Sequence, residues 1–483
     1  MRLLSTPVRL TGPLVLSQLV LLVTADERAR ADAAVEWIPS VLAGDLSGQY
    51  AAERELAKEG HDRATLGREA FIARVHVFEA DHRRTAAETF ARLGLDLDLD
   101  AAAIDREDVV RAARTAFVQL YESGLLHREE QVVDTCPRCA TVVDAADAQP
   151  AELDGERLLV DLGDGVVVPT LTPELLPGVV AVIAPEGPSE VTVPIANRAV
   201  PVLPGEEPAF VVPAHDAASL EVARAHGLFP VEVLNDLGEV VHEGPLHGMG
   251  RYAARAAARD LLGVEGEPAV EQASKCRRCG TVVVPRLGLH WFLDTAGLEV
   301  LAADQLREGL LDVTPLAARD ELLERAGAGG TWCLSHQVWA GSPVPVWTCL
   351  DCGQLSVAVD QPSSCGKCMG ELDADDSVLD ARFIGAVWPL VAAGWPDSRV
   401  DAEVVADTTV LTTPAGLIRW ALPMAALGLA LAGSAPFCCI AAVDVRTDPG
   451  DPEPVVMADL DALIESAGAD AVRAALVQGG LPD

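Results

Sequence analysis

Eight of the eleven cysteines in this chain of 483 residues occur as Cys-x-x-Cys pairs. The pairs are Cys136/Cys139, Cys276/Cys279, Cys349/Cys352 and Cys365/Cys368. Two thiolates at this spacing supply half of a tetrahedral zinc site, and in a chain of this size they indicate metal binding in a reducing compartment more than a disulfide framework. We therefore expect zinc and a cytoplasmic location. Cys333, Cys438 and Cys439 follow no such pattern and are expected to be small buried residues.

The spacing between the pairs predicts two separate metal sites. Cys352 and Cys365 have twelve residues between them, a spacing typical of a zinc ribbon. The other two pairs are separated by 136 residues, from Cys139 to Cys276. An inserted domain leaves and re-enters its host at neighbouring points, so these two pairs can meet at its base. Four cysteines per metal leave no open coordination position, so both zinc ions would be structural.

The pattern of apolar residues predicts an α/β protein with a β-rich insertion. Helical spacing marks 68–72 and 109–121, whereas 150–265 holds short β-branched runs separated by Gly, Pro and Asp, with one helix expected there. We predict a first α/β segment (1–135), the insertion (136–279), a connective segment with the zinc ribbon (280–375) and a second α/β segment (376–483) that ends in one helix over 459–477.

The charge of the chain argues against extensive nucleic-acid contact. Lys and Arg number 36 against 73 Asp and Glu, giving a formal net charge of −37. Such a field repels phosphates, so a nucleic acid would need a local basic patch. Arg251, Arg255, Arg259 and the run Lys275–Arg278 are the candidates, and ordinary surface charge is the alternative.

Two stretches are apolar enough to be considered as a secretory signal or a membrane-spanning helix. The run 13–24 imitates a secretory signal, but the zinc-type cysteine pairs argue against export. The run 416–443 is interrupted by Arg419, Pro423 and Pro436 and fits a buried helix followed by a strand better than a membrane span. No membrane association is expected.

With the cysteine pairs placed, the sequence between them resembles the valyl-tRNA synthetases. Val378–Pro389 and Gly394–Asp397 are similar to that family's stretch around its Ala-x-Trp-Pro and Gly-Trp-Pro pieces. Trp332–Trp339 is similar to its Trp-Cys-Ile-Ser-Arg segment, and Val212–Asp216 to the Thr-Pro-Ala-His-Asp of its editing domain. The resemblance runs in order over nearly the whole chain. It implies a split, doubly wound Rossmann-like nucleotide-binding domain, an inserted editing domain, zinc-bearing modules and, in the family, valine–tRNA ligase activity.

The two signatures with which this family meets ATP phosphates are missing. The His-x-Gly-His motif should fall on Val15–Gln18, after Thr11 and Gly12, and the Lys-Met-Ser-Lys-Ser loop is replaced by the acidic run Asp448–Pro454. Both motifs place donors where negative charge grows during adenylate formation. ATP-dependent activation is therefore expected to be lost, and ATP is a doubtful ligand. The cleft is left as a remnant near Thr11, Gly12, Ser17 and Gln18.

The amino-acid pocket and the editing site are partly kept. Pro7 and Trp332 remain, but Arg382 stands where the resemblance places the tryptophan that lines the valine pocket. In the editing region, Asp216 matches the aspartate that grips the substrate amino group, and Thr170 matches part of the threonine-rich strand. Alternatively, the side chains of residues 215 and 216 satisfy backbone groups of a turn. The chain ends at Asp483, where the family's anticodon-binding domain would follow, so this chain is not expected to read an anticodon.

Four functions follow from these observations. The first is a non-catalytic binding or regulatory homologue, whose partner would be a small molecule or a protein, since the charge disfavours tRNA. The second is a freestanding editing deacylase that uses Asp216. The third is an enzyme with a new ligand in the old cleft, suggested by Arg382 because a buried guanidinium requires a carboxylate or phosphate. The fourth is a valine–tRNA ligase, by similarity alone.

Overall fold

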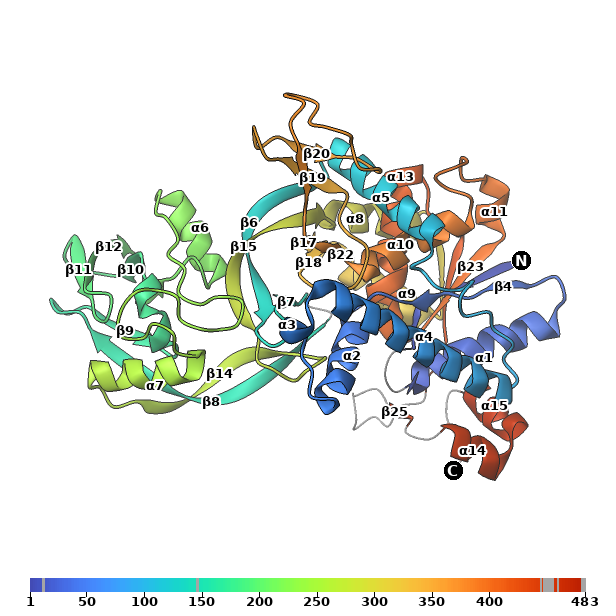
Figure 1. Cartoon of the computed structure of the whole chain (residues 1–483), viewed down its shortest axis with the longest axis horizontal. Coiled ribbons are helices and arrows are strands. Elements are labelled where there is room, and N and C mark those ends of the chain that lie inside the picture. Colours follow the sequence, from blue (N-terminus) through green and yellow to red (C-terminus); the bar gives the residue numbers. More distant parts are fainter. Residues whose placement is uncertain (11–13, 145–146, 444, 446–455, 458–459, 479–483) are drawn as a thin grey trace. The chain divides into compact units, whose positions relative to one another are not determined.

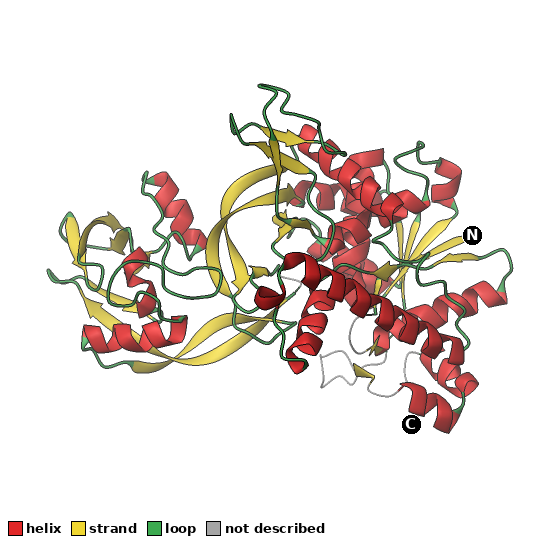
Figure 2. Ribbon diagram, in the orientation of Figure 1, coloured by secondary structure: helices red, strands yellow, loops and turns green. Residues whose placement is uncertain are grey.

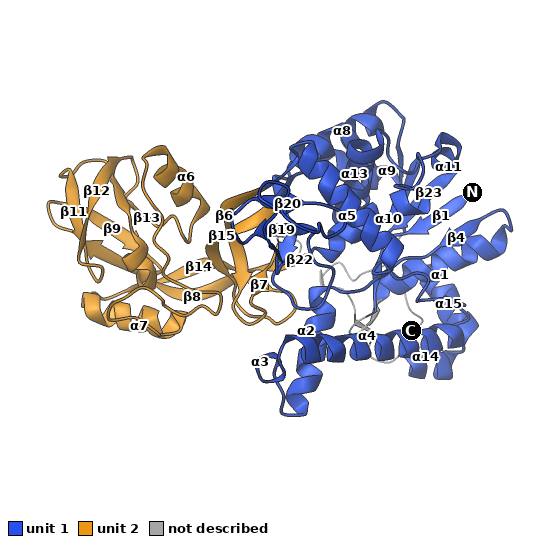
Figure 3. Ribbon diagram, turned by 45° about the horizontal axis from the view of Figure 1, so that its top comes forward, with its two compact units in different colours: residues 1–127, 292–483 blue, residues 128–291 orange. Residues whose placement is uncertain are grey.

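The computed structural model describes the chain except for residues 11–13, 145–146, 444, 446–455, 458–459 and 479–483. The chain forms two compact units, Met1–His127 together with Phe292–Asp483, and Arg128–Trp291 (Figure 3). The first unit is thus assembled from two stretches of sequence that flank the second. The finer division into four segments stays a prediction.

The first unit is built on a five-stranded parallel sheet (Figure 1). In spatial order its strands are β16 (Asp312–Thr314), β24 (Cys439–Ala442), β23 (Thr408–Thr412), β1 (Arg2–Ser5) and β4 (Glu36–Ile38). Leu4, Val410 and Ile440 are register-matched on one face and buried, while Leu3 and Leu411 are buried on the opposite face. Burial on both faces is what a parallel sheet requires, and it explains the nearly continuous apolar strands.

Helices surround this sheet (Figure 2). They are α1 (Leu16–Ala31), α2 (Leu46–Lys58), α3 (Arg63–Leu66), α4 (Arg68–Arg92), α5 (Glu107–Glu122), α8 (Ala296–Arg307), α9 (Leu316–Arg325), α10 (Ala381–Ala392), α11 (Ala402–Ala406), α12 (Pro414–Gly416), a π-helical turn η2 (Leu417–Ala421), α13 (Leu422–Ala432), α14 (Leu460–Ala467) and α15 (Ala469–Val477). The spacing of the buried residues explains them; α5, for example, buries Val109, Ala113, Phe117 and Leu120 along one stripe. α1 packs on β1, β4 and β23.

The remaining strands of the first unit form small sheets. They are β2 (Val8–Arg9) with β5 (Val41–Leu42), β3 (Leu14–Val15) with β25 (Val456–Met457), β18 (Ser335–His336) with β22 (Val378–Leu379), and β20 (Leu355–Val357), β19 (Val346–Cys349) and β21 (Leu372–Ala374). The third and fourth cysteine pairs, for which a zinc ribbon is expected, lie in and around the last three strands.

The second unit is rich in β-structure. Its strands are β7 (Thr141–Val142), β8 (Ala148–Asp161), β9 (Val167–Thr170), β10 (Ala181–Ala184), β11 (Glu190–Val193), β12 (Arg198–Pro204), β13 (Ala209–Val211) and β14 (Glu267–Cys276). β6 (Leu126–Cys136) and β15 (Val284–Asp294) are neighbours in one sheet with β7 and β17 (Thr331–Cys333), and along them the chain passes from one unit to the other. Its helices are a short 3₁₀ helix η1 (Pro173–Gly178), α6 (Ala217–Ala225) and α7 (Arg251–Leu262).

Three expectations need correction. The insertion carries two α-helices, α6 and α7, and not one. The predicted C-terminal helix is two helices, because Gly468 with φ of 85° ends α14 and begins α15. Cys438 and Cys439 are half-buried, since they lie at the start of the short strand β24 and not in its middle.

One helical stretch, Pro414–Ala432, is long and apolar enough to cross a membrane by length and composition. In the folded chain 56% of its most apolar window is buried, as in a core helix. The strand β24 follows it, so the predicted order of helix and strand is confirmed over 416–443.

Candidate functional sites

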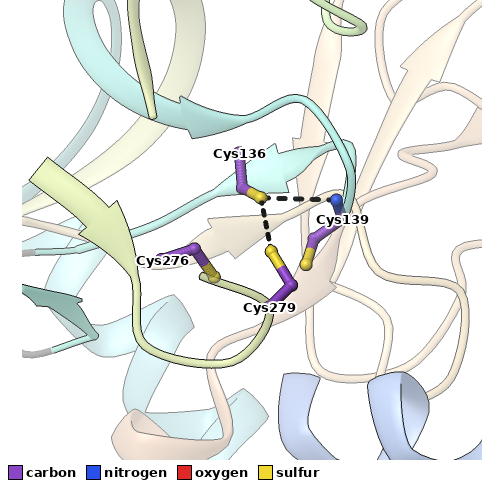
Figure 4. A group of neighbouring side chains, drawn as sticks. All are labelled: Cys136, Cys139, Cys276 and Cys279. Atoms are coloured by element: carbon purple, nitrogen blue, oxygen red, sulfur yellow. Dashed lines mark hydrogen bonds between the residues drawn. The ribbon is translucent and has the colours of Figure 1, made fainter. Parts of the chain in front are cut away.

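The first two cysteine pairs meet in the second unit. Cys136 and Cys139 lie at the end of β6 and Cys276 and Cys279 at the end of β14, and all four sulfur atoms are within 4.8 Å of one another (Figure 4). The Sγ atoms of Cys136 and Cys279 are 3.4 Å apart. Each pair forms a tight turn, in which the Ala140 and Gly280 amides donate to the carbonyls of Cys136 and Cys276. The 136 intervening residues therefore bring the pairs together, as predicted.

The third and fourth pairs form a second four-cysteine cluster, in the first unit. The Sγ atoms of Cys349 and Cys368 are 3.4 Å apart, and those of Cys352 and Cys365 are 3.7 Å apart. The Gly353 amide donates to the Cys349 carbonyl, and a φ of 69° at this residue requires the freedom of glycine. Cys352 and Cys368 are exposed, whereas the sulfurs of the first cluster are mostly buried.

The donor sets of both clusters fit zinc. Four thiolates this close repel one another strongly, so they are stable together only around a cation, and four soft sulfur ligands favour Zn²⁺ in tetrahedral geometry. Among the described residues each cluster offers four sulfur ligands and no fifth donor, so the metal would have a structural role. In the first cluster it would tie β6 to β14.

The second unit also contains a cavity of about 990 Å³. Thr170, Thr172, His215 and Asp216 line it, together with β14 residues and Asp134 from β6. The editing-like candidates Thr170 and Asp216 therefore share one cavity. The sequence reasoning missed Asp134, although its position two residues before Cys136, on a strand that enters the insertion, was a usable signal.

Asp216 and His215 serve the backbone, as the alternative interpretation predicted. The Asp216 carboxylate accepts a hydrogen bond of 2.7 Å from the Ser219 amide and caps α6. His215 Nδ1 lies 2.9 Å from the Pro285 carbonyl, and Nε2 accepts from the amides of Val233 and Leu234. Burial lowers the pKa of His215 to about 4, so the ring is neutral at pH 7 and is not a ready proton donor.

The three arginines of the first candidate basic patch are paired with carboxylates of the chain. Arg251 and Arg255 form a buried quartet with Glu174 and Glu271, with N···O distances of 2.6–3.3 Å. Burial alone would lower the pKa of Arg255, but the hydrogen bonds and charges of the two glutamates outweigh it and raise the pKa. Arg259 pairs with Glu156. The sequence indicated these arginines as candidates for a patch, with ordinary surface charge as the alternative, and it did not show that Glu174 and Glu271 face Arg251 and Arg255.

In the second basic run, only Arg278 has a carboxylate partner among the contacts of the described residues. Arg278 pairs with Asp147 at 2.5 Å, and Arg277 donates to the Ala148 carbonyl. These arginines thus hold the start of β8 beside the first cysteine cluster.

The doubly wound sheet reverses its strand order between β1 and β23, and the residues predicted to border a nucleotide cleft follow β1 in the sequence. Pro7 follows β1 and is buried near Gly385 and Trp420. The Thr6 and Thr412 hydroxyls are 3.3 Å apart. Ser17 and Gln18 are half-buried at the start of α1. Thr11, Gly12 and the replaced loop Asp448–Pro454 lie outside the described residues.

Trp332 and Arg382 are brought together beside Asp380. The Arg382 guanidinium lies 4.4 Å from the Trp332 ring centroid, and its Nε is 3.7 Å from the Asp380 carboxylate. Asp380 also accepts a 2.8 Å hydrogen bond from the Trp332 indole. Burial alone would raise the pKa of Asp380, but the His336 hydrogen bond and charge and the Arg382 charge hold it at about 2. Asp380 thus supplies from within the chain the carboxylate that we expected an external ligand to bring.

Comparisons with known proteins agree with this architecture. The family model for class I tRNA synthetases (I, L, M and V) matches residues 29–479. The valine–tRNA ligase of Desulfotalea psychrophila is 30% identical over 431 residues, which cover 83% of this chain and 49% of that protein. That of Dehalococcoides mccartyi is 31% identical over 480 residues, covering 92% and 54%. The chain therefore spans about half the length of these relatives.

A solved structure shows the same fold. Methionyl-tRNA synthetase of Mycobacterium tuberculosis, determined with methionyl-adenylate, aligns with a TM-score of 0.52 and 11% identity, covering 98% of this chain and 63% of that one. The parallel sheet, the β-rich insertion and the match over residues 29–479 lead to one conclusion: this chain belongs to the class I tRNA synthetase family and is homologous to the valine–tRNA ligases.

Proposed function

We propose that this chain is a valyl-tRNA synthetase-like binding protein that does not activate an amino acid with ATP. One observation carries the proposal: no histidine stands at Val15–Gln18 and no lysine in Asp448–Pro454, where the family meets the phosphates. Removing a single donor of this kind typically costs about two to three orders of magnitude in rate. With all of them gone, the growing charge of the transition state has no counterpart.

The surroundings of Arg382 support the same proposal. Arg382 and Asp380 place a charged pair where the family resemblance places the wall of a valine pocket. An apolar side chain bound there would remove water from both charges without replacing it by a polar partner, which is unfavourable. Valine is therefore a poor ligand for this position.

The test is ATP–pyrophosphate exchange with valine, together with calorimetric titration of ATP into the zinc-loaded chain. We expect no exchange above a protein-free control and no saturable heat. A working valine–tRNA ligase run in parallel provides the positive control. Formation of aminoacyl-adenylate at the rate of that ligase would refute the proposal.

A second function, aminoacyl-tRNA deacylation, is favoured by the cavity that Asp216 and Thr170 share. Incubation with threonine-mischarged valine tRNA tests it. Asp216→Asn is the sharp variant, because asparagine also caps helices but cannot hold an ammonium group by charge. Hydrolysis by the wild type that is lost in Asp216→Asn would establish this function. If the same amount of mischarged tRNA remains after incubation with the wild type and with Asp216→Asn, the deacylase function is excluded.

The partner we propose is a small molecule or a protein. The net charge of −37 and the pairing of Arg251, Arg255 and Arg259 with carboxylates disfavour tRNA. The two thiol clusters favour a reducing, cytoplasmic location with zinc bound in both.

A further inference from the structure

The two four-cysteine clusters differ in how far solvent reaches their sulfur atoms. In the first cluster, three cysteines are buried and Cys279 is half-buried. In the ribbon cluster, Cys349 and Cys365 are buried, whereas Cys352 and Cys368 are exposed. Both clusters consist of four thiol ligands, so their chemistry is the same and their exposure is not. A dissolved oxidant therefore reaches the ribbon cluster first, because the oxidation of cysteine follows thiolate character and exposure.

The two exposed sulfur atoms lie close enough to be joined. Cys352 is in the turn that follows β19, Cys368 is in the turn that precedes β21, and their Sγ atoms are 3.4 Å apart. The sulfur atoms of a disulfide bond are about 2.0 Å apart, so a movement of about 1.4 Å brings this pair to bonding distance. Oxidation of one of these thiolates thus leaves the other in place to complete a disulfide bond.

The ribbon has little besides its metal to keep it folded. Its strands β19, β20 and β21 have three or four residues each. Two of the four buried residues within 346–374 are themselves metal ligands; the four are Val346, Trp347, Cys349 and Cys365. A module of this size buries too little apolar surface to fold alone, so metal binding supplies its folding free energy. Loss of zinc is therefore expected to disorder residues 346–374.

The base of the ribbon is held independently of its metal. The strands β18 and β22 enclose the ribbon in sequence and pair with each other, with Ser335 opposite Leu379. The Val344 amide also donates to the Ser377 carbonyl. These bonds lie outside the three ribbon strands, so they survive when the ribbon opens. The ribbon can therefore lose its order while the parallel sheet of the first unit stays folded.

We propose that the ribbon cluster is a redox switch, in which a peroxide joins Cys352 and Cys368 by a disulfide bond and the ribbon opens as zinc leaves. The first cluster keeps its zinc under the same conditions. Two ligands, Cys349 and Cys365, remain at the ribbon site after oxidation, which is half of the tetrahedral set that zinc requires.

The reaction with hydrogen peroxide proceeds in two steps. One exposed thiolate attacks a peroxide oxygen, the O–O bond breaks, and a sulfenic acid forms while the departing hydroxide takes a proton from solvent. The second thiolate then attacks the sulfenic sulfur, the S–S bond forms, the S–O bond breaks, and the second hydroxide is also protonated. Two electrons pass from the two thiolates to one peroxide, and two water molecules are produced.

The test treats the zinc-loaded full chain with hydrogen peroxide and follows released zinc with a chromogenic chelator. We expect the ribbon to release its zinc at least about tenfold faster than the first cluster. Mass spectrometry after thiol alkylation should find Cys352 joined to Cys368, with the four cysteines of the first cluster still reduced. Amide hydrogen exchange should become faster within 346–374, and a dithiol reductant with added zinc should restore the slow exchange.

Two variants identify the source of the released zinc. Cys276→Ser removes a ligand of the first cluster and is expected to keep the fast release. Met369→Leu removes a thioether that is 75% exposed beside Cys368 and that peroxide also oxidises, and it should release zinc at the wild-type rate. If Cys276→Ser does not fold, the alkylation map of the wild type still identifies the oxidised cluster.

The proposal is overturned by release of both zinc ions at equal rates, by faster release from the first cluster, or by no release from the folded chain. Loss of the fast release in Met369→Leu would also overturn it, because methionine oxidation would then be the trigger. None of these outcomes depends on whether the chain binds ATP or hydrolyses mischarged tRNA.

Discussion

Glu79 is the buried acid whose replacement should stabilise the protein. It lies in α4, is 6% exposed, and its Oε1 has no hydrogen-bond partner among the described residues. Burial raises its pKa from 4.5 to about 7, and the charges of Asp45 and Asp105 add to this effect. The Arg83 charge and a hydrogen bond from the Gly44 backbone oppose it without cancelling it. Glu79 is therefore ionised at pH 8 in an environment that disfavours its charge.

The direction in which stability changes with pH follows from proton binding at Glu79. Between pH 4.5 and about 7 the folded chain holds a proton at Glu79 that the unfolded chain has lost, so stability falls as pH rises through this window. Each pKa unit corresponds to about 1.4 kcal/mol, so the penalty is about 3 kcal/mol at pH 8. At pH 5 it is only about 1 kcal/mol, because the group is protonated in the folded chain and partly protonated in the unfolded one.

Glu79→Gln keeps the shape of the side chain and removes the charge. We expect it to raise the free energy of unfolding of the first unit by about 3 kcal/mol at pH 8 and by about 1 kcal/mol at pH 5. Urea unfolding at the two pH values measures this difference. Glu88→Gln is the control, since Glu88 is exposed on the same helix. An equal gain at both pH values, or the same gain from Glu88→Gln, would refute the reasoning.

Two further predictions concern the cysteine clusters and the buried ion-pair quartet around Glu174. The purified chain should contain two zinc ions by elemental analysis, and Cys276→Ser should leave one and lower the melting temperature; full zinc content in that variant would contradict the assignment. Glu174→Gln should destabilise the chain by about 3–5 kcal/mol in denaturant unfolding, because Glu174 is 0% exposed and its loss leaves two buried arginines with one carboxylate. Glu156→Gln, at an exposed pair with Arg259, should cost less than about 1 kcal/mol, and a similar loss in both variants would argue against the quartet.

The sequence predicts best those features that depend on a short spacing or on one dominant element. A metal site requires all of its ligands, so the pairs at Cys136 and Cys276 predict their own meeting across 136 residues without any knowledge of the path between them. The stripe of buried residues in α5 is likewise local. His215 and Asp216 were interpretable as backbone-satisfying residues because a capping role needs only the next few amides.

Features that depend on which side chains face each other across distant strands were not predictable. Arg251 and Arg255 form a basic stripe on α7, and only the register of β14 and the position of η1 show that Glu271 and Glu174 neutralise it. Asp134 enters the cavity for the same reason, because the pairing of β6 with β15 decides its neighbours. A sequence pattern predicts which residue a side chain contacts only when the two residues are close in the sequence.

The distribution of charge over the chain accounts for both the features that are retained and those that are replaced. The residues that hold the architecture together, namely the eight paired cysteines and the buried quartet around Glu174, are present and mutually satisfied. The cations that the family uses on phosphate are absent from both of its signatures, and in the second unit Arg251, Arg255, Arg259 and Arg278 are paired with carboxylates. The cavity of the second unit is lined by Asp134 and Asp216 and also by Arg157 and Arg251, the latter held by Glu174 and Glu271. A polyanion is therefore disfavoured both at the two replaced signatures and at the paired arginines of the second unit.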